Sequence, residues 1–170
     1  QPLVVDEGAT AIIDNSRLLT TDVENSPAQI FYVITSGPNN GTVLLSGAAT
    51  TAFTQADIDL GLVAYQHDGG ETTGDGFEFE VDDGQGTVTS ATFNVTVTPQ
   101  NDEQVLAANL PLIVNEGAAA TISSGNLLTT DPDHAPSQLV YTITTGPSLG
   151  VVLLSGAATV TFTQDDIDAG

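Results

Sequence analysis

Positive charge is almost absent from the sequence. Its 170 residues include 22 acidic side chains but only one basic side chain, Arg17, so the formal net charge is −21. A protein that binds nucleic acid or an anionic membrane surface needs a basic patch to do so. The composition therefore excludes nucleic acid and the membrane surface as partners.

Cysteine, methionine and tryptophan are absent as well. Without cysteine the chain has no disulfide framework, zinc ribbon, iron–sulfur cluster or cysteine nucleophile. No run of about 18 apolar residues is present, so we expect no membrane insertion. No signal peptide opens the sequence, from which we expect either a mature chain or a fragment.

The residues that are present favour β-strands. Hydrophobic residues make up 40% of the chain and charged residues only 14%, and valine, isoleucine and threonine are abundant. A disordered acidic chain would be poor in such β-branched residues, whereas strands are rich in them. We therefore expect a folded, acidic, all-β protein.

An internal repeat organises the chain. Residues 1–61 align without a gap with residues 110–170 at an offset of 109, and 36 of the 61 pairs are identical. An offset of this size is typical of a domain rather than of a solenoid unit. We predict a complete repeat at residues 1–109, with its linker at about 99–109, and the N-terminal part of a second, truncated repeat at residues 110–170. Either the chain is a window of a longer array or a neighbouring chain completes the second repeat.

Alternating apolar residues predict the strands and their buried face. The pattern is clearest at Phe77, Phe79 and Val81, which alternate with acidic residues. The same alternation predicts further core residues at Ile30, Tyr32, Ile34, Val63, Tyr65, His67, Phe93, Val95 and Val97. Turns rich in Gly, Asn and Asp separate these runs, which indicates a Greek-key β-sandwich of about seven strands. A single helical turn is expected around residues 55–60.

The carboxylates gather in turns and at the repeat boundary. Calcium takes about six to eight oxygen ligands, mostly from carboxylates and carbonyls, and loops collect at the two ends of a sandwich. Tandem sandwiches would bring acidic loops together at each junction, where we predict calcium ions of unknown number. The candidate ligands are Glu7, Asp22, Glu24, Asp57, Asp59, Asp82, Asn101, Asp102, Glu116, Asp131 and Asp133.

Six short motifs in a fixed order connect the sequence to a known family. They are Glu7-Gly8, Asp22-Val23-Glu24 and residues 53–61, 63–69, 75–84 and 99–102. In this order they resemble the cadherin-like repeat of the chondroitin sulfate proteoglycan type, which occurs in animal surface proteoglycans and in tandem arrays of bacterial surface proteins. The resemblance covers the first repeat and all that is present of the second. It implies a cadherin- or immunoglobulin-like sandwich with calcium between repeats.

The resemblance also implies where the acidic residues lie. Those expected at the C-terminal junction of the first repeat are Glu7, Asp57, Asp59, Asn101 and Asp102. Those expected to meet them from the second repeat are Asp131 and Asp133. Those expected to face a preceding repeat are Asp22, Glu24 and Asp82. The linker is shorter than in the fuller cadherin form, which leaves the number of ions open.

Local roles compete with metal binding at several of these residues. Asp57 forms a capping box with Thr54 if a short helix begins there. Asp22 and Asp82 form Asx turns in the alternative interpretation. Residues 101–102 are then a simple polar linker.

No catalytic motif is present. The sequence lacks G-x-S-x-G, H-E-x-x-H and phosphate-binding patterns. Paired carboxylates could serve a glycosidase, but these carboxylates sit in turns rather than in an identifiable cleft. His67 alternates with Tyr65 on an apolar face, so it is better interpreted as a satisfied core histidine than as a ligand. We predict that the chain is not an enzyme.

These features favour a structural repeat of a long extracellular adhesin or fibre, secreted or at the cell surface, stiffened by calcium. Its partners would be adjacent repeats or neighbouring copies of the chain. One alternative is a self-assembling filament subunit that strands of a neighbouring chain complete. Another is a module that binds host or matrix glycans or proteins.

Two N-glycosylation sequons are present, Asn40-Gly41-Thr42 and Asn94-Val95-Thr96. They become modification sites only in a host that glycosylates such sequences. The sequence alone does not indicate which of the two sequons is modified.

Overall fold

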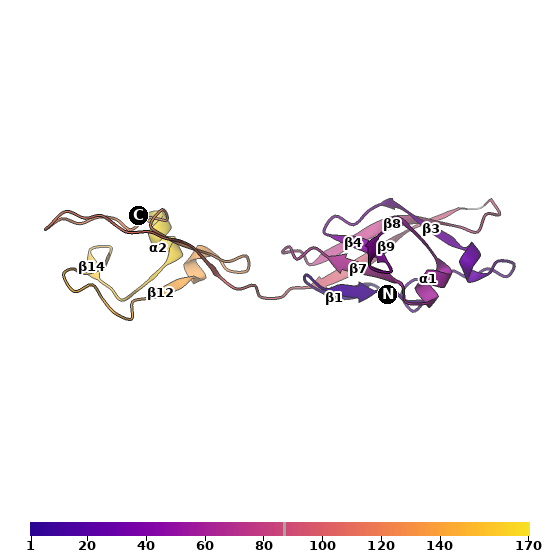
Figure 1. Cartoon of the computed structure of the whole chain (residues 1–170), viewed down its shortest axis with the longest axis horizontal. Helices are drawn as coiled ribbons and strands as arrows, with labels where there is room; N and C mark the ends of the chain where they lie inside the picture. Colours follow the sequence, from indigo (N-terminus) through magenta and orange to yellow (C-terminus); the bar gives the residue numbers. More distant parts are fainter. Residues whose placement is uncertain (87) are drawn as a thin grey trace. The chain divides into compact units, whose positions relative to one another are not determined.

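The structure is a computed structural model of the chain, and it describes residues 1–86 and 88–170. The chain forms two compact units, Gln1–Gln100 and Asn101–Gly170, which Figure 1 colours from indigo to pink and from orange to yellow. Within the described ranges, no helix has the length and apolar character that a membrane crossing requires.

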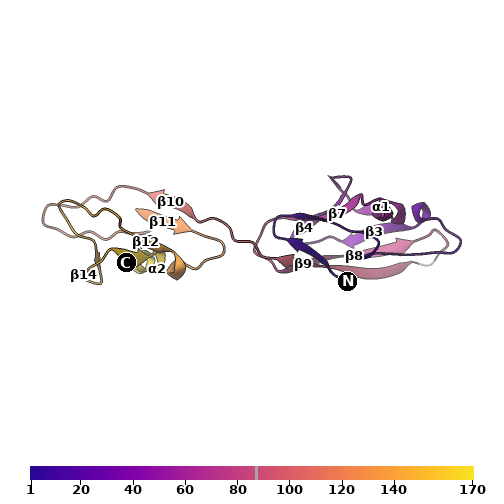
Figure 2. The same ribbon diagram turned by 90° about the horizontal axis from the view of Figure 1, so that it is seen from below.

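The described residues of the first unit form two β-sheets. The larger has the strand order β1 (Leu3–Asp6), β9 (Thr89–Thr98), β8 (Gly74–Asp82), β3 (Phe31–Ser36) and β6 (Ala52–Thr54). The smaller has the order β2 (Thr10–Ile12), β7 (Val63–His67), β4 (Gly41–Leu45) and β5 (Ala48–Ala49). Figure 2 shows β4 and β7 in one layer and β8 and β9 in the other. The predicted all-β sandwich is confirmed.

Among the described residues of this unit, helical structure is limited to η1 (Pro27–Gln29) and α1 (Gln55–Asp59). α1 begins where β6 ends, because Thr54 and Asp57 form the capping box that the sequence indicated. Asp57 Oδ2 accepts hydrogen bonds from Thr54 N at 2.8 Å and from Thr54 Oγ1 at 2.7 Å. A cap of this kind satisfies backbone N–H groups that the first helical turn would leave unpaired.

The core lies between the two sheets and follows the predicted alternation. Its fully buried members are Leu3, Val5, Ile13, Ile30, Tyr32, Val43, Phe53, Ile58, Val63, Tyr65, Phe77, Phe79, Phe93, Val95 and Val97. Aromatic rings stack across neighbouring strands, with Tyr32 and Phe53 5.1 Å apart between ring centroids and Phe77 and Phe93 also 5.1 Å apart. Alternation predicted this face correctly because successive side chains of a strand point to opposite sides of the sheet.

Strand register defines the two ends of the first unit. Phe31, at the start of β3, lies opposite both Thr54 of β6 and Asp82 of β8. We call this the α1 end, because α1 follows Thr54 directly. Asp6 of β1 lies opposite Thr98, the last residue of β9. We call this the Thr98 end; it is opposite the α1 end because β9 begins beside the end of β8.

The second unit contains three small two-stranded sheets. They pair β10 (Val105–Asn109) with β11 (Leu127–Thr130), β12 (Val140–Thr142) with β15 (Thr161–Thr163), and β13 (Leu153–Leu154) with β14 (Ala157–Ala158). The helical elements are η2 (Pro136–Gln138) and α2 (Gln164–Ala169), at the same repeat positions as η1 and α1. The sequence given contains no counterparts of β7, β8 and β9 for this unit.

Candidate functional site

Glu7 anchors the Thr98 end of the first unit. It follows β1, and its backbone N–H donates to Thr98 O at 2.9 Å. Its carboxylate Oε2 accepts from Gln100 N at 3.1 Å, whereas Oε1 is buried and has no hydrogen-bond partner in the described part of the chain. A carboxylate oxygen of Glu71 lies within 4.8 Å of the Glu7 carboxylate. Two carboxylates this close repel each other, and a cation between them would relieve the repulsion.

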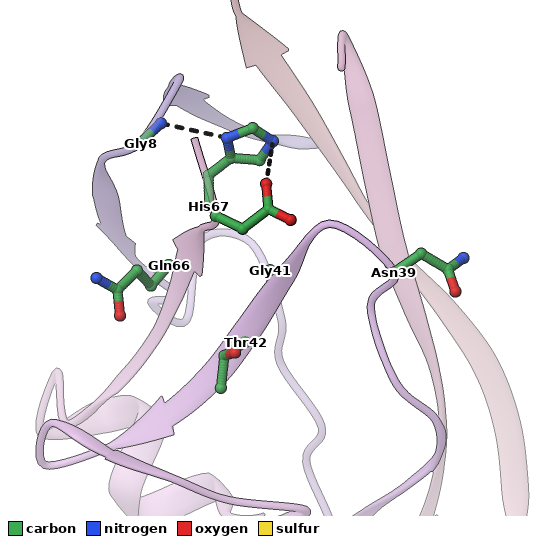
Figure 3. A pocket seen from close by; sticks show the side chains of 7 residues that line it. Gly8, Asn39, Gly41, Thr42, Gln66 and His67 are labelled. Atoms are coloured by element: carbon green, nitrogen blue, oxygen red, sulfur yellow. Dashed lines mark hydrogen bonds and ion pairs between the residues drawn. The ribbon is translucent and has the colours of Figure 1, made fainter. Parts of the chain in front are cut away.

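His67 lies directly behind this loop and is 2% exposed. Its Nδ1 accepts hydrogen bonds from Gly8 N and Gly69 N, both at 3.2 Å, and its Nε2 lies 2.8 Å from Thr72 Oγ1. Figure 3 shows the ring beside the Gly8 backbone, in the wall of a shallow hollow of about 430 Å³. The ring Nε2 also lies 3.8 Å from Asp68 Oδ1. The interpretation of His67 as a satisfied core histidine is confirmed. The ring ties the Glu7-Gly8 turn to the loop that carries Glu71.

Asp75 holds the loop before β4 at the same end. Its two carboxylate oxygens accept from Asn39 N and Asn40 N, both at 3.0 Å, and Oδ2 also accepts from the Tyr65 hydroxyl at 2.7 Å. Burial alone would raise the pKa of Asp75. These hydrogen bonds and one from Gly76 outweigh burial and lower the pKa below its usual value. Burial and the neighbouring carboxylate raise the pKa of Tyr65. Sequence reasoning missed this pair, although Asp75 shares the inward alternation of Phe77.

The α1 end contains a second acidic loop. Asp22 Oδ1 accepts from Glu24 N at 2.8 Å and from Asn25 N at 2.7 Å. Asn25 is 9% exposed, and its Nδ2 donates to Asp83 O at 3.1 Å. The Asn25 Oδ1 atom is buried and has no hydrogen-bond partner among residues 1–86 and 88–170. The Asx-turn interpretation of Asp22 therefore holds, and a buried acceptor lies beside the turn.

Asp57 and Asp59 also lie at the α1 end, so the expectation that they share an end with Glu7 is wrong. The register places Thr54 opposite Phe31, and the chain passes from Thr54 directly into α1. Asp82 ends β8 at the same end, where its Oδ1 accepts from Gly84 N at 2.8 Å as an Asx turn would. The structure thus brings Asp57, Asp59 and Asp82 to the end that carries the Asp22 loop.

A buried network that the sequence did not reveal connects this loop to α1. Gln55 Oε1 accepts from Thr20 N at 2.8 Å and lies 2.6 Å from the Tyr32 hydroxyl, while Gln55 Nε2 donates to Asp59 Oδ1 at 3.0 Å. Burial raises the pKa of Tyr32. The network fixes one oxygen of Asp59 and the backbone two residues before Asp22. The only sequence signal was the Phe-Thr-Gln-x-Asp motif in both copies.

The same network recurs in the second unit at nearly the same distances. Gln164 Oε1 accepts from Thr129 N at 2.9 Å and lies 2.6 Å from the Tyr141 hydroxyl, and Gln164 Nε2 donates to Asp168 Oδ1 at 2.8 Å. Its recurrence indicates that each repeat positions its acidic loop in the same way.

The acidic loop of the second unit differs in one residue. Asp131 Oδ1 accepts from Asp133 N and His134 N, both at 2.9 Å, and His134 takes the place that Asn25 has in the first copy. Ligand atoms of Asp131, Asp133 and His134 all lie within 4.8 Å of one another. Asp102 N donates to Asp133 Oδ2 at 2.6 Å, so the linker residue lies against this loop.

Among the residues described, the remaining two candidates form no hydrogen bond with an acidic loop. Asn101 Nδ2 donates to Asp102 O at 2.7 Å within the linker. Glu116, the counterpart of Glu7, is exposed, and no hydrogen bond of its side chain occurs among the residues described. Metal binding at any of the eleven candidates stays a prediction.

Curated proteins similar to the chain are extracellular. The chain is 31% identical over 180 residues to the mouse extracellular matrix organizing protein FRAS1, which aligns 97% of the chain with 4% of that protein. It is 36% identical over 176 residues to human chondroitin sulfate proteoglycan 4, with 96% of the chain and 7% of that protein aligned. Extracellular matrix protein 3 of Lytechinus variegatus is 29% identical over 186 residues, covering 96% of the chain and 6% of that protein.

The chain therefore spans less than a tenth of the length of each of these relatives. Two of them are named as extracellular matrix proteins and the third as a proteoglycan. The expected extracellular location is confirmed by this set of relatives.

A family model described as cadherin-like matches residues 1–97 and 105–170. Each matched range lies within one compact unit and covers one copy of the repeated sequence. The two-sheet fold of the first unit and the proteoglycan relative agree with the resemblance seen in the sequence motifs. The chain belongs to the cadherin-like family, in the form shared with chondroitin sulfate proteoglycan 4 and FRAS1.

Proposed function

We propose that the chain is a non-enzymatic structural repeat of a long extracellular protein, and that calcium binds at the ends of its repeats. The family, the extracellular relatives and the 109-residue tandem repeat support the structural role. The buried histidine supports the non-enzymatic role, because His67 is only 2% exposed and so is not open to a substrate. A bound ion would stiffen an array in which one repeat follows another.

The observation that carries the calcium proposal is one buried oxygen at each end of the first unit that has no donor among residues 1–86 and 88–170. Glu7 Oε1 lies at the Thr98 end and Asn25 Oδ1 at the α1 end. Buried polar atoms without a partner are uncommon in folded proteins and call for an explanation such as an ion. The Glu7 carboxylate lies within 4.8 Å of a Glu71 carboxylate oxygen, and the Asn25 backbone N–H donates to the Asp22 carboxylate. Carboxylate and amide oxygens are the ligands that calcium prefers.

The second unit should bind calcium more weakly than the first. His134 replaces Asn25 there and supplies an imidazole nitrogen, which suits zinc, copper or nickel better than calcium. The Asp131 carboxylate is also engaged with that ring, since His134 Nδ1 lies 3.0 Å from Asp131 Oδ1. The two copies thus offer an internal comparison of the same loop.

A thermal melt with calcium, with magnesium and with chelator tests the proposal. Calcium at about 100 times its Kd should add roughly 2.7 kcal/mol of stability for each site that only the folded chain provides. The rise in Tm should be smaller in Glu7→Gln and unchanged in Glu78→Gln, an exposed strand residue that serves as the control. An equal Tm in calcium and in chelator would exclude calcium binding.

A further inference from the structure

The sequon Asn94-Val95-Thr96 lies on strand β9, outside the acidic loops. From this setting we propose that Asn94 is an acceptor for an N-linked oligosaccharide when the chain passes through a secretory pathway that modifies Asn-X-Thr. The motif supplies the acceptor amide and the hydroxyl two residues later that the modification requires. The inference does not depend on calcium binding.

Both polar side chains of the sequon lie on the outer face of the larger sheet. Asn94 and Thr96 are exposed, whereas the alternate residues Phe93, Val95 and Val97 are buried in the core. No hydrogen bond engages the Asn94 side chain in the part of the chain that the structure describes. A sugar on Asn94 would therefore disturb neither the core nor a side-chain hydrogen bond.

The strand next to the sequon has no side chains at the facing positions. Gly76 of β8 lies opposite Asn94, and Gly74 lies opposite Thr96. A Cβ atom at Gly76 would lie only 2.6 Å from Phe93 O, so the close approach of β9 requires glycine there. Because position 76 is a glycine, no side chain from that position covers the sheet surface beside Asn94, and the first sugar of a glycan can lie there.

The other sequon has a much more restricted setting. Asn40 is half-buried, its N–H donates to Asp75 Oδ2 at 3.0 Å, and its carbonyl accepts from the Tyr65 hydroxyl at 3.2 Å. A side chain at Gly41, the next residue, would collide with Tyr65. The structure therefore distinguishes the two sequons, which the sequence alone does not.

The modification is a simple substitution at the sugar. The co-reactant is a lipid-linked oligosaccharide pyrophosphate. A bond forms between C1 of its first sugar and Nδ2 of Asn94, that nitrogen loses one proton, and the lipid pyrophosphate leaves. The product carries a hydrated group over the outer face of β8 and β9.

Secretion of the 170-residue chain from a mammalian cell line tests the proposal. Intact mass before and after peptide-N-glycosidase F should reveal a glycan, and peptide mapping should show conversion of Asn94 to Asp on its removal. Asn94→Gln and Thr96→Val should each abolish this glycan, whereas the matched variant Asn40→Gln should retain it.

The Thr96→Val variant keeps Asn94 and replaces an exposed β-branched residue by another, so it should fold like the parent chain. An unchanged Tm for Thr96→Val shows that loss of the glycan is not loss of the fold. An unmodified Asn94 in the secreted parent chain overturns the proposal, as does higher occupancy at Asn40 than at Asn94.

Discussion

Asp75 is a carboxylate whose charge directly supports the fold of the first unit. It accepts hydrogen bonds from two backbone N–H groups and from Tyr65, and its pKa is lowered. An acidic group whose pKa is lower in the folded chain than in the unfolded chain stabilises the fold at any pH above its unfolded-state pKa. This contribution is lost as the pH falls through the folded-state pKa. Asp75 therefore contributes to stability at neutral pH and stops doing so in acid, below about pH 4.

The variant Asp75→Asn tests this role. The amide replaces one accepting oxygen by a donor, so at least one N–H or hydroxyl loses its partner, at a cost of about 1–3 kcal/mol. We expect a lower free energy of unfolding at pH 7 and a shallower loss of stability in acid than in the parent chain. Urea unfolding at pH 7 and pH 3 measures both. A variant as stable as the parent at pH 7 would contradict the role.

Tyr32 and Tyr141 allow the buried glutamine network to be tested in both copies. Removing the hydroxyl in Tyr32→Phe takes a hydrogen bond of 2.6 Å from Gln55, and Tyr141→Phe takes the equivalent one from Gln164. Each should cost about 1 kcal/mol in its own unit. Amide hydrogen exchange should show faster exchange at Thr20 in the first variant and at Thr129 in the second. Equal exchange in variant and parent would show that the hydroxyls do not hold these loops.

At the scale of strands and helices, the local sequence pattern predicted which face of each strand is buried. It did not predict at which end of the unit each acidic residue lies. Residues such as Phe93, Val95 and Val97 could be assigned to the core because a strand alternates its side chains with a period of two. The position of α1 beside Asp82 could not be predicted, because it follows from which strands pair, and pairing joins residues far apart in the sequence. Asp57 and Asp59 were assigned to the wrong end for this reason.

The close approach of β8 and β9 leads to a prediction at the same scale. Gly76→Ala should destabilise the first unit by about 1–3 kcal/mol, because its Cβ would meet the backbone of Phe93 at 2.6 Å. Gly74→Ala in the same strand is the matched control, since its Cβ would meet Val95 O at an ordinary 3.6 Å. Chemical unfolding of the two variants measures the difference. Equal stability of the two would show that β9 does not require glycine at position 76.

At the scale of the whole chain, the charge of −21 exceeds what the proposed ions can balance. Sixteen of the 22 acidic residues lie in residues 1–109, together with Arg17, so the first repeat alone has a charge of −15. A calcium ion at each end would offset only a part of this. Most of the acidity is then surface charge, which keeps a protein with no lysine and little other positive charge soluble.

A calcium titration of the ¹⁵N-labelled chain, followed by the amide resonances of each residue, tests the calcium proposal most directly. Calcium binding at both ends of the first unit should give saturable shifts at Glu7 and residues 68–71, and at residues 22–25 and 82–84. Smaller shifts are expected at residues 131–134 and none in the middle of β9. Magnesium at the same concentration should leave these resonances nearly unchanged, because it prefers a smaller octahedral site. The absence of saturable shifts at both ends of the first unit would contradict calcium binding there.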